Sequence, residues 1–166
     1  MRDGADTGNN KRMRIAIDCD DAAAGLKKIV FDHVRSNGYM IEDLDYLGRD
    51  PEADYPVIGH NLALGVKNGG YDRGILLCGT GLGMAIIANK VEGVYAGTCH
   101  DVYSAERLAK SNDAQILTMG ALVVGPEAAK KIVDAWLGSE FTGGRSRAKV
   151  DKLRELERAS FGNSPK

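Results

Sequence analysis

Cys78 is the residue whose type and position most clearly suggest chemistry. It ends the apolar run Ile75–Leu77 and precedes the glycine loop Gly79-Thr80-Gly81-Leu82-Gly83. A strand followed by a glycine loop and a helix directs backbone N–H groups and a helix N-terminus at an anion, and that position also stabilises a thiolate. Two interpretations follow: Cys78 is a general base beside an anion-binding loop, or a small buried side chain at a strand end.

The glycine loop differs from the two common phosphate-binding motifs. A dinucleotide fingerprint needs a small residue where Met84 stands and normally follows the first strand of the sheet. A P-loop needs Lys followed by Ser or Thr, and no lysine follows Gly83 closely. The loop therefore predicts an anion-binding turn that is not a nucleotide motif, with simple tight-turn chemistry as the alternative.

The elements that must position Cys78 alternate in type along the chain. Strand-like runs are RIAIDC, YMIEDL, RGILLC, VYAGTC and AQILTM, and helical stretches cover 22–36, 55–68, 81–90, 102–111, 126–137 and 145–158. This alternation predicts an α/β fold, a Rossmann-like three-layer sandwich with an approximately five-stranded parallel sheet. Ligands of such sheets bind at the carboxyl ends of the strands, where the sequence places Asp20, Asp21, Cys78 and His100.

Length and composition predict one domain with a small-molecule ligand. We expect a disordered extension at 1–12, a single domain at 13–158 and a C-terminal tail at 159–166. The net charge of −1 with scattered Lys and Arg argues against nucleic acid or an acidic membrane as partner, and no apolar run approaches the roughly 20 residues of a membrane span. Three cysteines without a secretory signal predict a cytoplasmic location.

Several segments together resemble the ribose-5-phosphate isomerase B family, which includes the subunits of galactose-6-phosphate isomerase. They are IDCDDAAAGLK, DYP at 54–56, GILLCGTGLGMAIIANK, YSAERLAKSNDAQIL, VVGPEAAKKIVDAWL and GGRSRAKV, between Met13 and Glu157. The resemblance implies a homodimer or a dimer of dimers with active sites shared between subunits. It also implies interconversion of an aldose phosphate and a ketose phosphate without a metal or another cofactor.

The resemblance also implies a role for each residue of the glycine loop. Cys78 would remove a proton from the carbon beside the carbonyl, giving a cis-enediolate, and return it to the neighbouring carbon. Preorganised donors at a developing oxyanion are each worth about 10²–10³ in rate, and this role falls to Thr80 and to the amides of Gly79, Gly81, Leu82 and Gly83. Cys78 is thus expected to be the base, whereas Cys19 and Cys99 are expected to be structural.

Further positions match residues of the family that contact the substrate. Asp20 would bind sugar hydroxyls and Tyr55 would lie near the sugar, although a Tyr before Pro56 could equally be a packed aromatic at a helix start. Asn112 would reach the partner's site, or it could cap a helix end. Arg145 and Lys149, four residues apart on one helical face, would bind the partner's phosphate, with a solvated charged face as the alternative.

The phosphate contacts depart from the family pattern at three positions. Asp21 stands where the family has a histidine that touches phosphate, Leu122 where an arginine is often found, and Lys149 where a second arginine is usual. Lysine cannot form the bidentate fork of arginine. We therefore expect a phosphate site that is rebuilt or weaker, with Asp21 among the substrate-binding residues.

The acid that opens a sugar ring also differs. Ser111 stands where the family has the ring-opening histidine, and His100 is an unexpected histidine at a strand end. Asp101 could orient His100 or cap the next helix. We therefore include His100 among the candidate catalytic residues.

Four functions remain to be compared. The first is a ribose-5-phosphate isomerase B-like aldose–ketose isomerase. The second is a tetrose 4-phosphate isomerase, because a tetrose 4-phosphate cannot close a furanose and needs no ring-opening histidine. The third is a sugar-phosphate-binding protein without catalysis. A thiol redox protein is disfavoured, because the chain has no Cys-x-x-Cys and no nearby resolving partner for Cys78.

Overall fold

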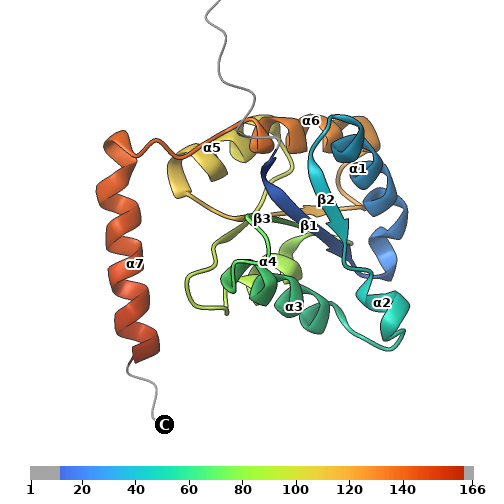
Figure 1. The fold of residues 1–166 in the computed structure, drawn as a ribbon, viewed down its shortest axis with the longest axis horizontal. Coiled ribbons are helices and arrows are strands. Elements are labelled where there is room, and N and C mark those ends of the chain that lie inside the picture. Colours follow the sequence, from blue (N-terminus) through green and yellow to red (C-terminus); the bar gives the residue numbers. More distant parts are fainter. Residues whose placement is uncertain (1–11, 163–166) are drawn as a thin grey trace, which may run out of the picture.

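A parallel sheet of five strands forms the middle layer of the computed structural model, which describes residues 12–162 (Figure 1). The strands are β1 (Arg14–Cys19), β2 (Met40–Asp43), β3 (Arg73–Cys78), β4 (Ala96–Thr98) and β5 (Ile116–Gly120), in the order β2-β1-β3-β5-β4. All four strand pairs are parallel. The predicted Rossmann-like α/β fold is therefore confirmed.

Helices cover both faces of the sheet (Figure 1). They are α1 (Ala24–Ser36), α2 (Tyr46–Arg49), α3 (Tyr55–Lys67), α4 (Leu82–Ala88), α5 (Val102–Asn112), α6 (Pro126–Leu137) and α7 (Arg147–Gly162), with short 3-10 turns at Asp21–Ala23 and Gly144–Ser146. One face carries α1, α5 and α6, and the other carries α3 and α4.

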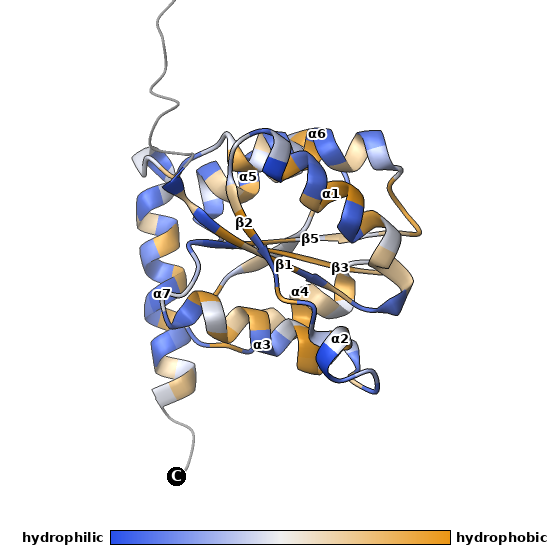
Figure 2. Cartoon of the chain, turned by 45° about the vertical axis from the view of Figure 1, so that its right-hand side comes forward, coloured by the Kyte–Doolittle hydropathy of each residue, from blue (hydrophilic) through white to orange (hydrophobic). Residues whose placement is uncertain are grey.

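The core lies in two layers, one on each face of the sheet. Along β3, Ile75 and Leu77 pack with α1, α5 and α6, whereas Leu76 and Cys78 pack with α3 and α4. Because both faces are covered, the central strands are mostly apolar and buried, as is typical of parallel sheets (Figure 2). This alternation places the Cys78 side chain on the α3–α4 face.

Some boundaries differ from those predicted. The stretch 81–90 forms a helix only over the seven residues of α4, and the side chain of Asn89 closes its end. Asn89 Nδ2 donates to the carbonyl oxygens of Ala85 (2.8 Å) and Ala96 (2.9 Å), and Asn89 Oδ1 accepts from the Ala96 N–H. The short helix α2 was not predicted.

The ends of the predicted domain also shift. α7 continues to Gly162, so the predicted tail at 159–166 begins as helix. Residues 1–11 of the predicted extension, and residues 163–166, lie outside the described part of the chain. Within residues 12–162, no helix is long and apolar enough to cross a membrane.

α7 stands beside the domain and is held by contacts to two loops (Figure 1). Glu157 accepts hydrogen bonds from the Tyr95 hydroxyl (2.5 Å) and from the Gly93 N–H (3.0 Å). Arg154 donates to Asp113 at 2.5 Å. Tyr95 directly precedes β4 and Asp113 precedes β5, so α7 lies along the edge of the sheet from which these strands start.

Candidate active site

Cys78 lies at the carboxyl end of β3 and is only 6% exposed. The backbone N–H of Gly81 donates to Cys78 Sγ at 3.0 Å. A hydrogen bond from a fixed amide favours the charged form of an acidic group. The thiol that the sequence singled out therefore meets a fixed donor of the glycine loop.

The glycine loop lies directly against the end of β5. Gly81 has φ +78°, and a Cβ there would lie 2.8 Å from the carbonyl carbon of Met119. A Cβ on Gly120 would lie 2.7 Å from the carbonyl carbon of Thr80. The Ala121 N–H donates to the Cys78 carbonyl oxygen at 2.8 Å, which joins the ends of β3 and β5. Only glycine allows the two backbones to approach this closely.

Two amides of the loop have acceptors within the loop. The Gly81 N–H is directed at Cys78 Sγ, and the Leu82 N–H donates to Thr80 Oγ1 at 3.3 Å. Thr80 itself is exposed. Of the predicted oxyanion donors, the Gly81 N–H thus contacts Cys78, and the Leu82 N–H contacts Thr80.

Tyr55 lies against the glycine loop from the start of α3. Its ring occupies the space beside Gly83, where a Cβ would lie 2.6 Å from Tyr55 Cε2. Tyr55 is 43% exposed. It is therefore both an aromatic at a helix start and a residue next to the loop.

Asp20, Asp21 and Tyr55 share a cavity of about 360 Å³. Asp20 Oδ1 is buried and has no hydrogen-bond partner among the described residues. Burial raises the pKa of Asp20, and the charge of Asp21 raises it further. Glu52 and Asp54 also line the cavity, so this wall is acidic. It suits sugar hydroxyl groups, which can donate to carboxylates, better than it suits a phosphate.

His100 contacts the end of β5 through one ring nitrogen. The Gly120 N–H donates to His100 Nε2 at 3.0 Å, so Nε2 is an acceptor and the proton of the neutral ring lies on Nδ1. Gly120 pairs in register with Cys78, which places His100 beside the same group of residues. Asp101 caps α5 by accepting the Ser104 N–H at 2.7 Å, and the bonds from Ser104 lower the pKa of Asp101.

Asn112, Arg145 and Lys149 lie toward the amino ends of the strands, whereas Cys78 lies at a carboxyl end. Asn112 ends α5, which runs back to the start of β5. The chain after α6 leaves at the start of β3, where Arg73 donates to the carbonyl oxygens of Trp136 and Ser139 at 2.6 Å. Strands of five or six residues span roughly 15–20 Å. The structure thus does not bring these three exposed side chains into the same subunit's Cys78 site.

The other two cysteines lie in the hydrophobic core. Burial raises the pKa of Cys19 to about 12 and that of Cys99 to about 11. Both residues are under 5% exposed. Their thiols stay protonated at neutral pH, in agreement with a structural role.

Two threonines near Cys78 carried no recognisable signal in the sequence. Thr98 and Thr118 pair in register on β4 and β5, and both hydroxyl groups lie within hydrogen-bond distance of the Gly81 carbonyl oxygen. The alternation of side chains along β5 could have placed Thr118 on the face of Cys78, but not its contact with Gly81.

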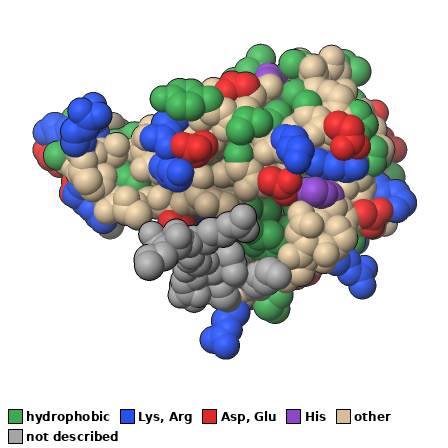
Figure 3. Space-filling view, turned by 90° about the horizontal axis from the view of Figure 1, so that it is seen from above, with side chains coloured by type: hydrophobic (Ala, Val, Ile, Leu, Met, Phe, Trp, Pro, Cys, Tyr) green, Lys and Arg blue, Asp and Glu red, His purple; other side chains and the backbone are tan. Residues whose placement is uncertain are grey.

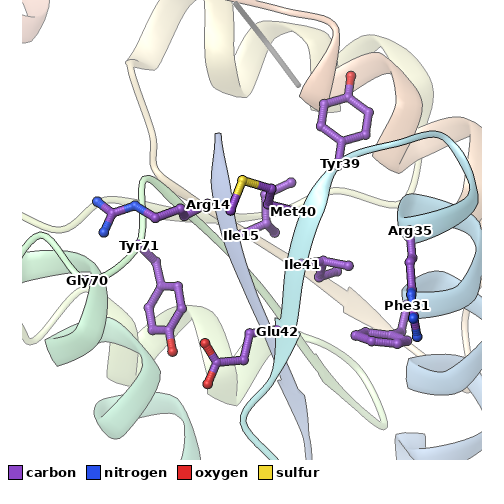
Figure 4. Close-up of a pocket in the computed structure, with 10 residues that line it drawn as sticks. All are labelled: Arg14, Ile15, Phe31, Arg35, Tyr39, Met40, Ile41, Glu42, Gly70 and Tyr71. Atoms are coloured by element: carbon purple, nitrogen blue, oxygen red, sulfur yellow. The ribbon is translucent and has the colours of Figure 1, made fainter. Parts of the chain in front are cut away.

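A larger cavity of about 700 Å³ lies along β1, β2 and α1, away from Cys78 (Figure 4). Its lining includes Phe31, Arg35, Tyr39, Met40 and Tyr71, and none of the predicted site residues. Of the predicted site residues, Asp20, Asp21 and Tyr55 line the smaller cavity instead.

Comparison with known proteins agrees with this geometry. The Ribose/Galactose Isomerase family matches residues 15–153. The chain is 50% identical to "Ribose-5-P isomerase B" of Listeria innocua (87% of this chain, 97% of that protein) and 48% identical to "D-erythrulose-4-phosphate isomerase" of Pectobacterium atrosepticum (87% and 95%). The solved structure of Clostridium thermocellum ribose-5-phosphate isomerase B matches with a TM-score of 0.83 at 42% identity, covering 89% of this chain and 99% of that one. The chain therefore belongs to the ribose/galactose isomerase family.

Proposed function

We propose that this protein interconverts the aldose and ketose forms of a small sugar phosphate, with Cys78 as the base. The observation that carries the proposal is the hydrogen bond from the Gly81 N–H to Cys78 Sγ inside the glycine loop. The thiolate takes the proton from the carbon beside the carbonyl, and the electron pair of that C–H bond forms the enediolate. The hydroxyl proton moves from one oxygen of the enediolate to the other, and the resulting thiol returns the carbon proton to the neighbouring carbon, so no net proton or electron is gained or lost.

The loop supplies the electrostatic part of this mechanism. Charge develops on the substrate oxygen as the enediolate forms, and fixed backbone amides at that oxygen lower the barrier. The Gly81 N–H contacts Cys78, and Thr80 and the other amides of residues 79–83 belong to the same loop. Asp20, whose buried Oδ1 lacks a partner among residues 12–162, accepts a hydrogen bond from a sugar hydroxyl group.

The experiment that tests this proposal is proton NMR in heavy water with a panel of four- to six-carbon sugar phosphates. Catalysis places solvent deuterium on the carbon beside the carbonyl. The Cys78→Ala variant should show no incorporation. Binding of a sugar phosphate without deuterium incorporation by the wild type would instead favour a binding protein that has lost the chemistry.

Ribose 5-phosphate is the substrate that the family resemblance and the Listeria innocua relative favour. It spends most of its time as a ring, so an acid at the ring oxygen is needed. Ser111 cannot serve as that acid, and we propose His100, which would donate from Nδ1 because Nε2 accepts the Gly120 N–H. Asp21 makes the wall beside β1 acidic, so the phosphate is expected to lie away from it.

The alternative substrate is erythrose 4-phosphate or erythrulose 4-phosphate. It is favoured by the Pectobacterium atrosepticum relative and by Ser111 at the place of the ring-opening histidine. The deciding measurement is kcat/KM for erythrose 4-phosphate against ribose 5-phosphate in wild type and in His100→Ala, with the exposed His60→Ala as control. Preference for ribose 5-phosphate that disappears only in His100→Ala would reject the tetrose assignment.

We also propose that the protein is a homodimer, or a dimer of dimers, with shared active sites. Asn112, Arg145 and Lys149 lie at the edge of the sheet opposite to Cys78, so in a shared site they would act on the partner's substrate. Exposed apolar side chains surround the glycine loop, including Leu82 and Leu122. α7 also exposes Leu153 and Leu156, which a second subunit could cover.

A cytoplasmic location fits three free cysteines in a sugar-phosphate isomerase. The proposed ligands remain a small phosphorylated sugar and a second copy of the chain, not nucleic acid or a membrane. The face covered by α1, α5 and α6 agrees with this, because Lys and Arg alternate there with Asp and Glu (Figure 3).

A further inference from the structure

Gly81 contacts Cys78 through its N–H and two threonines through its carbonyl oxygen. Its N–H donates to Cys78 Sγ at 3.0 Å. Its carbonyl oxygen accepts from Thr118 Oγ1 at 2.9 Å and lies 3.2 Å from Thr98 Oγ1. The Ala85 N–H of α4 also donates to this oxygen, at 3.1 Å. The carbonyl of the residue that contacts the thiol thus accepts from the Thr118 hydroxyl and the Ala85 N–H, and the single proton of Thr98 can be donated either to this oxygen or to Thr118 Oγ1.

The two hydroxyl groups form a pair beneath the glycine loop. Thr98 and Thr118 are register partners in β4 and β5, and their Oγ1 atoms are 2.8 Å apart. Thr118 is completely buried, on a sheet face that also carries the apolar Leu76 and Ile116. Burying a hydroxyl group is unfavourable unless it is hydrogen-bonded. The hydrogen bonds of Thr118 to the Gly81 oxygen and to Thr98 offset this cost, so the site is built around a hydroxyl donor.

We propose that Thr118, supported by Thr98, is a positioning residue that holds Gly81 so that its N–H stays on the Cys78 sulfur. Contact with the Met119 backbone prevents the loop from moving closer to β5, and the hydroxyl groups prevent it from moving away. Gly81 has a φ of +78°, and with its backbone fixed in this conformation, holding the carbonyl group also fixes the direction of its N–H. The expected effect on kcat rests on the proposed isomerase function, whereas the positioning of Gly81 does not.

The central test replaces Thr118 by valine. A methyl group in place of the hydroxyl would lie 2.9 Å from the Gly81 oxygen, shorter than the roughly 3.3–3.6 Å of carbon–oxygen contacts, so the loop must shift. We measure the pH at which Cys78 is alkylated by iodoacetamide at half its maximal rate. We expect this pH to rise by about half a unit or more, since the thiolate is the reactive form. kcat should fall about five- to tenfold, the effect of one hydrogen bond, with KM little changed.

Conservative and matched variants separate positioning from general destabilisation. Thr118→Ser keeps the donor and should restore both readouts. Thr98→Val leaves the shorter hydrogen bond from Thr118 to the Gly81 oxygen in place, and should change the alkylation profile and kcat less than Thr118→Val does. Ser139→Ala is the control, because it removes another buried hydroxyl group, bonded to the Ala135 carbonyl at 2.7 Å on the far edge of the sheet. It should leave the alkylation profile of Cys78 unchanged.

Mass spectrometry assigns the alkylated cysteine, so the readout does not need isomerase activity. An unchanged Cys78 profile in folded Thr118→Val, or an equal shift in Ser139→Ala, would overturn the proposal. If Thr118→Val does not fold, Thr118→Ala removes the hydroxyl without adding a methyl and must give the same upward shift. A wild type with the expected alkylation behaviour and no isomerase activity would refute the proposed function and leave the positioning role standing.

Discussion

At the scale of single residues, Cys78 is the group on which the proposed chemistry depends. Replacing it by serine keeps the size and hydrogen-bonding of the side chain, but a hydroxyl is far less acidic than a thiol. We expect kcat to fall about 10²–10⁴-fold, the usual contribution of a general base, with the circular dichroism spectrum unchanged. Cys99→Ala is the matched control and should retain activity. A Cys78→Ser enzyme with undiminished kcat would contradict the mechanism.

The buried thiols of Cys19 and Cys99 predict how stability depends on pH. Burial raises the pKa of Cys19 from 9.0 to about 12, so the folded state holds its proton where the unfolded state loses it. This contribution to stability is complete below pH 9 and is lost as the pH rises toward 12, at about 1.4 kcal/mol per pH unit for each such thiol.

Guanidinium unfolding between pH 8 and 10.5 measures this effect. Cys19→Ala is less stable throughout because it leaves a small cavity, but its free energy of unfolding should decline less steeply above about pH 9. Equal slopes for wild type and Cys19→Ala would show that the Cys19 thiol does not titrate as proposed.

At the scale of elements, the contacts of Glu157 control how firmly α7 is held. Glu157 accepts from the Tyr95 hydroxyl and the Gly93 N–H, which belong to the loop before β4. Glu157→Ala should accelerate hydrogen–deuterium exchange in α7 while leaving the core strands protected. Glu155→Ala is the control, because Glu155 pairs with Lys152 of the same helix. Equal exchange in both variants would mean that other contacts hold α7.

At the scale of the whole molecule, the opposite positions of Cys78 and Arg145 predict that subunits share sites. Sedimentation should give at least twice the monomer mass of 17.8 kDa. A heterodimer of Cys78→Ala and Arg145→Ala subunits contains one intact site of two. A random equal mixture, half heterodimer, should therefore regain about a quarter of wild-type activity. The control replaces Arg145→Ala by Glu140→Ala, a change at another exposed residue. Subunits with Glu140→Ala should be active without mixing.

Much of this protein could be predicted from its sequence. The alternation of apolar runs and amphipathic stretches identified the five strands and their parallel arrangement, because both patterns arise from local periodicity. The run from Ile75 to Asn89 identified the glycine loop and its cysteine. The exclusion of a P-loop and of a dinucleotide fingerprint also needed only residue types. Boundaries were less accurate, because ends such as that of α4 depend on the Asn89 side chain contacting Ala96 in the following strand.

The tertiary structure alone decided which residues meet. Asn112, Arg145 and Lys149 were assigned to the partner's site by resemblance alone. Their separation from Cys78 within one subunit follows from the tertiary structure, because α5 runs back against its strands and the chain after α6 leaves at the start of β3. The contacts of Thr98 and Thr118 with Gly81 join residues up to 37 positions apart in the chain. Such contacts depend on strand order and register, which local periodicity does not specify.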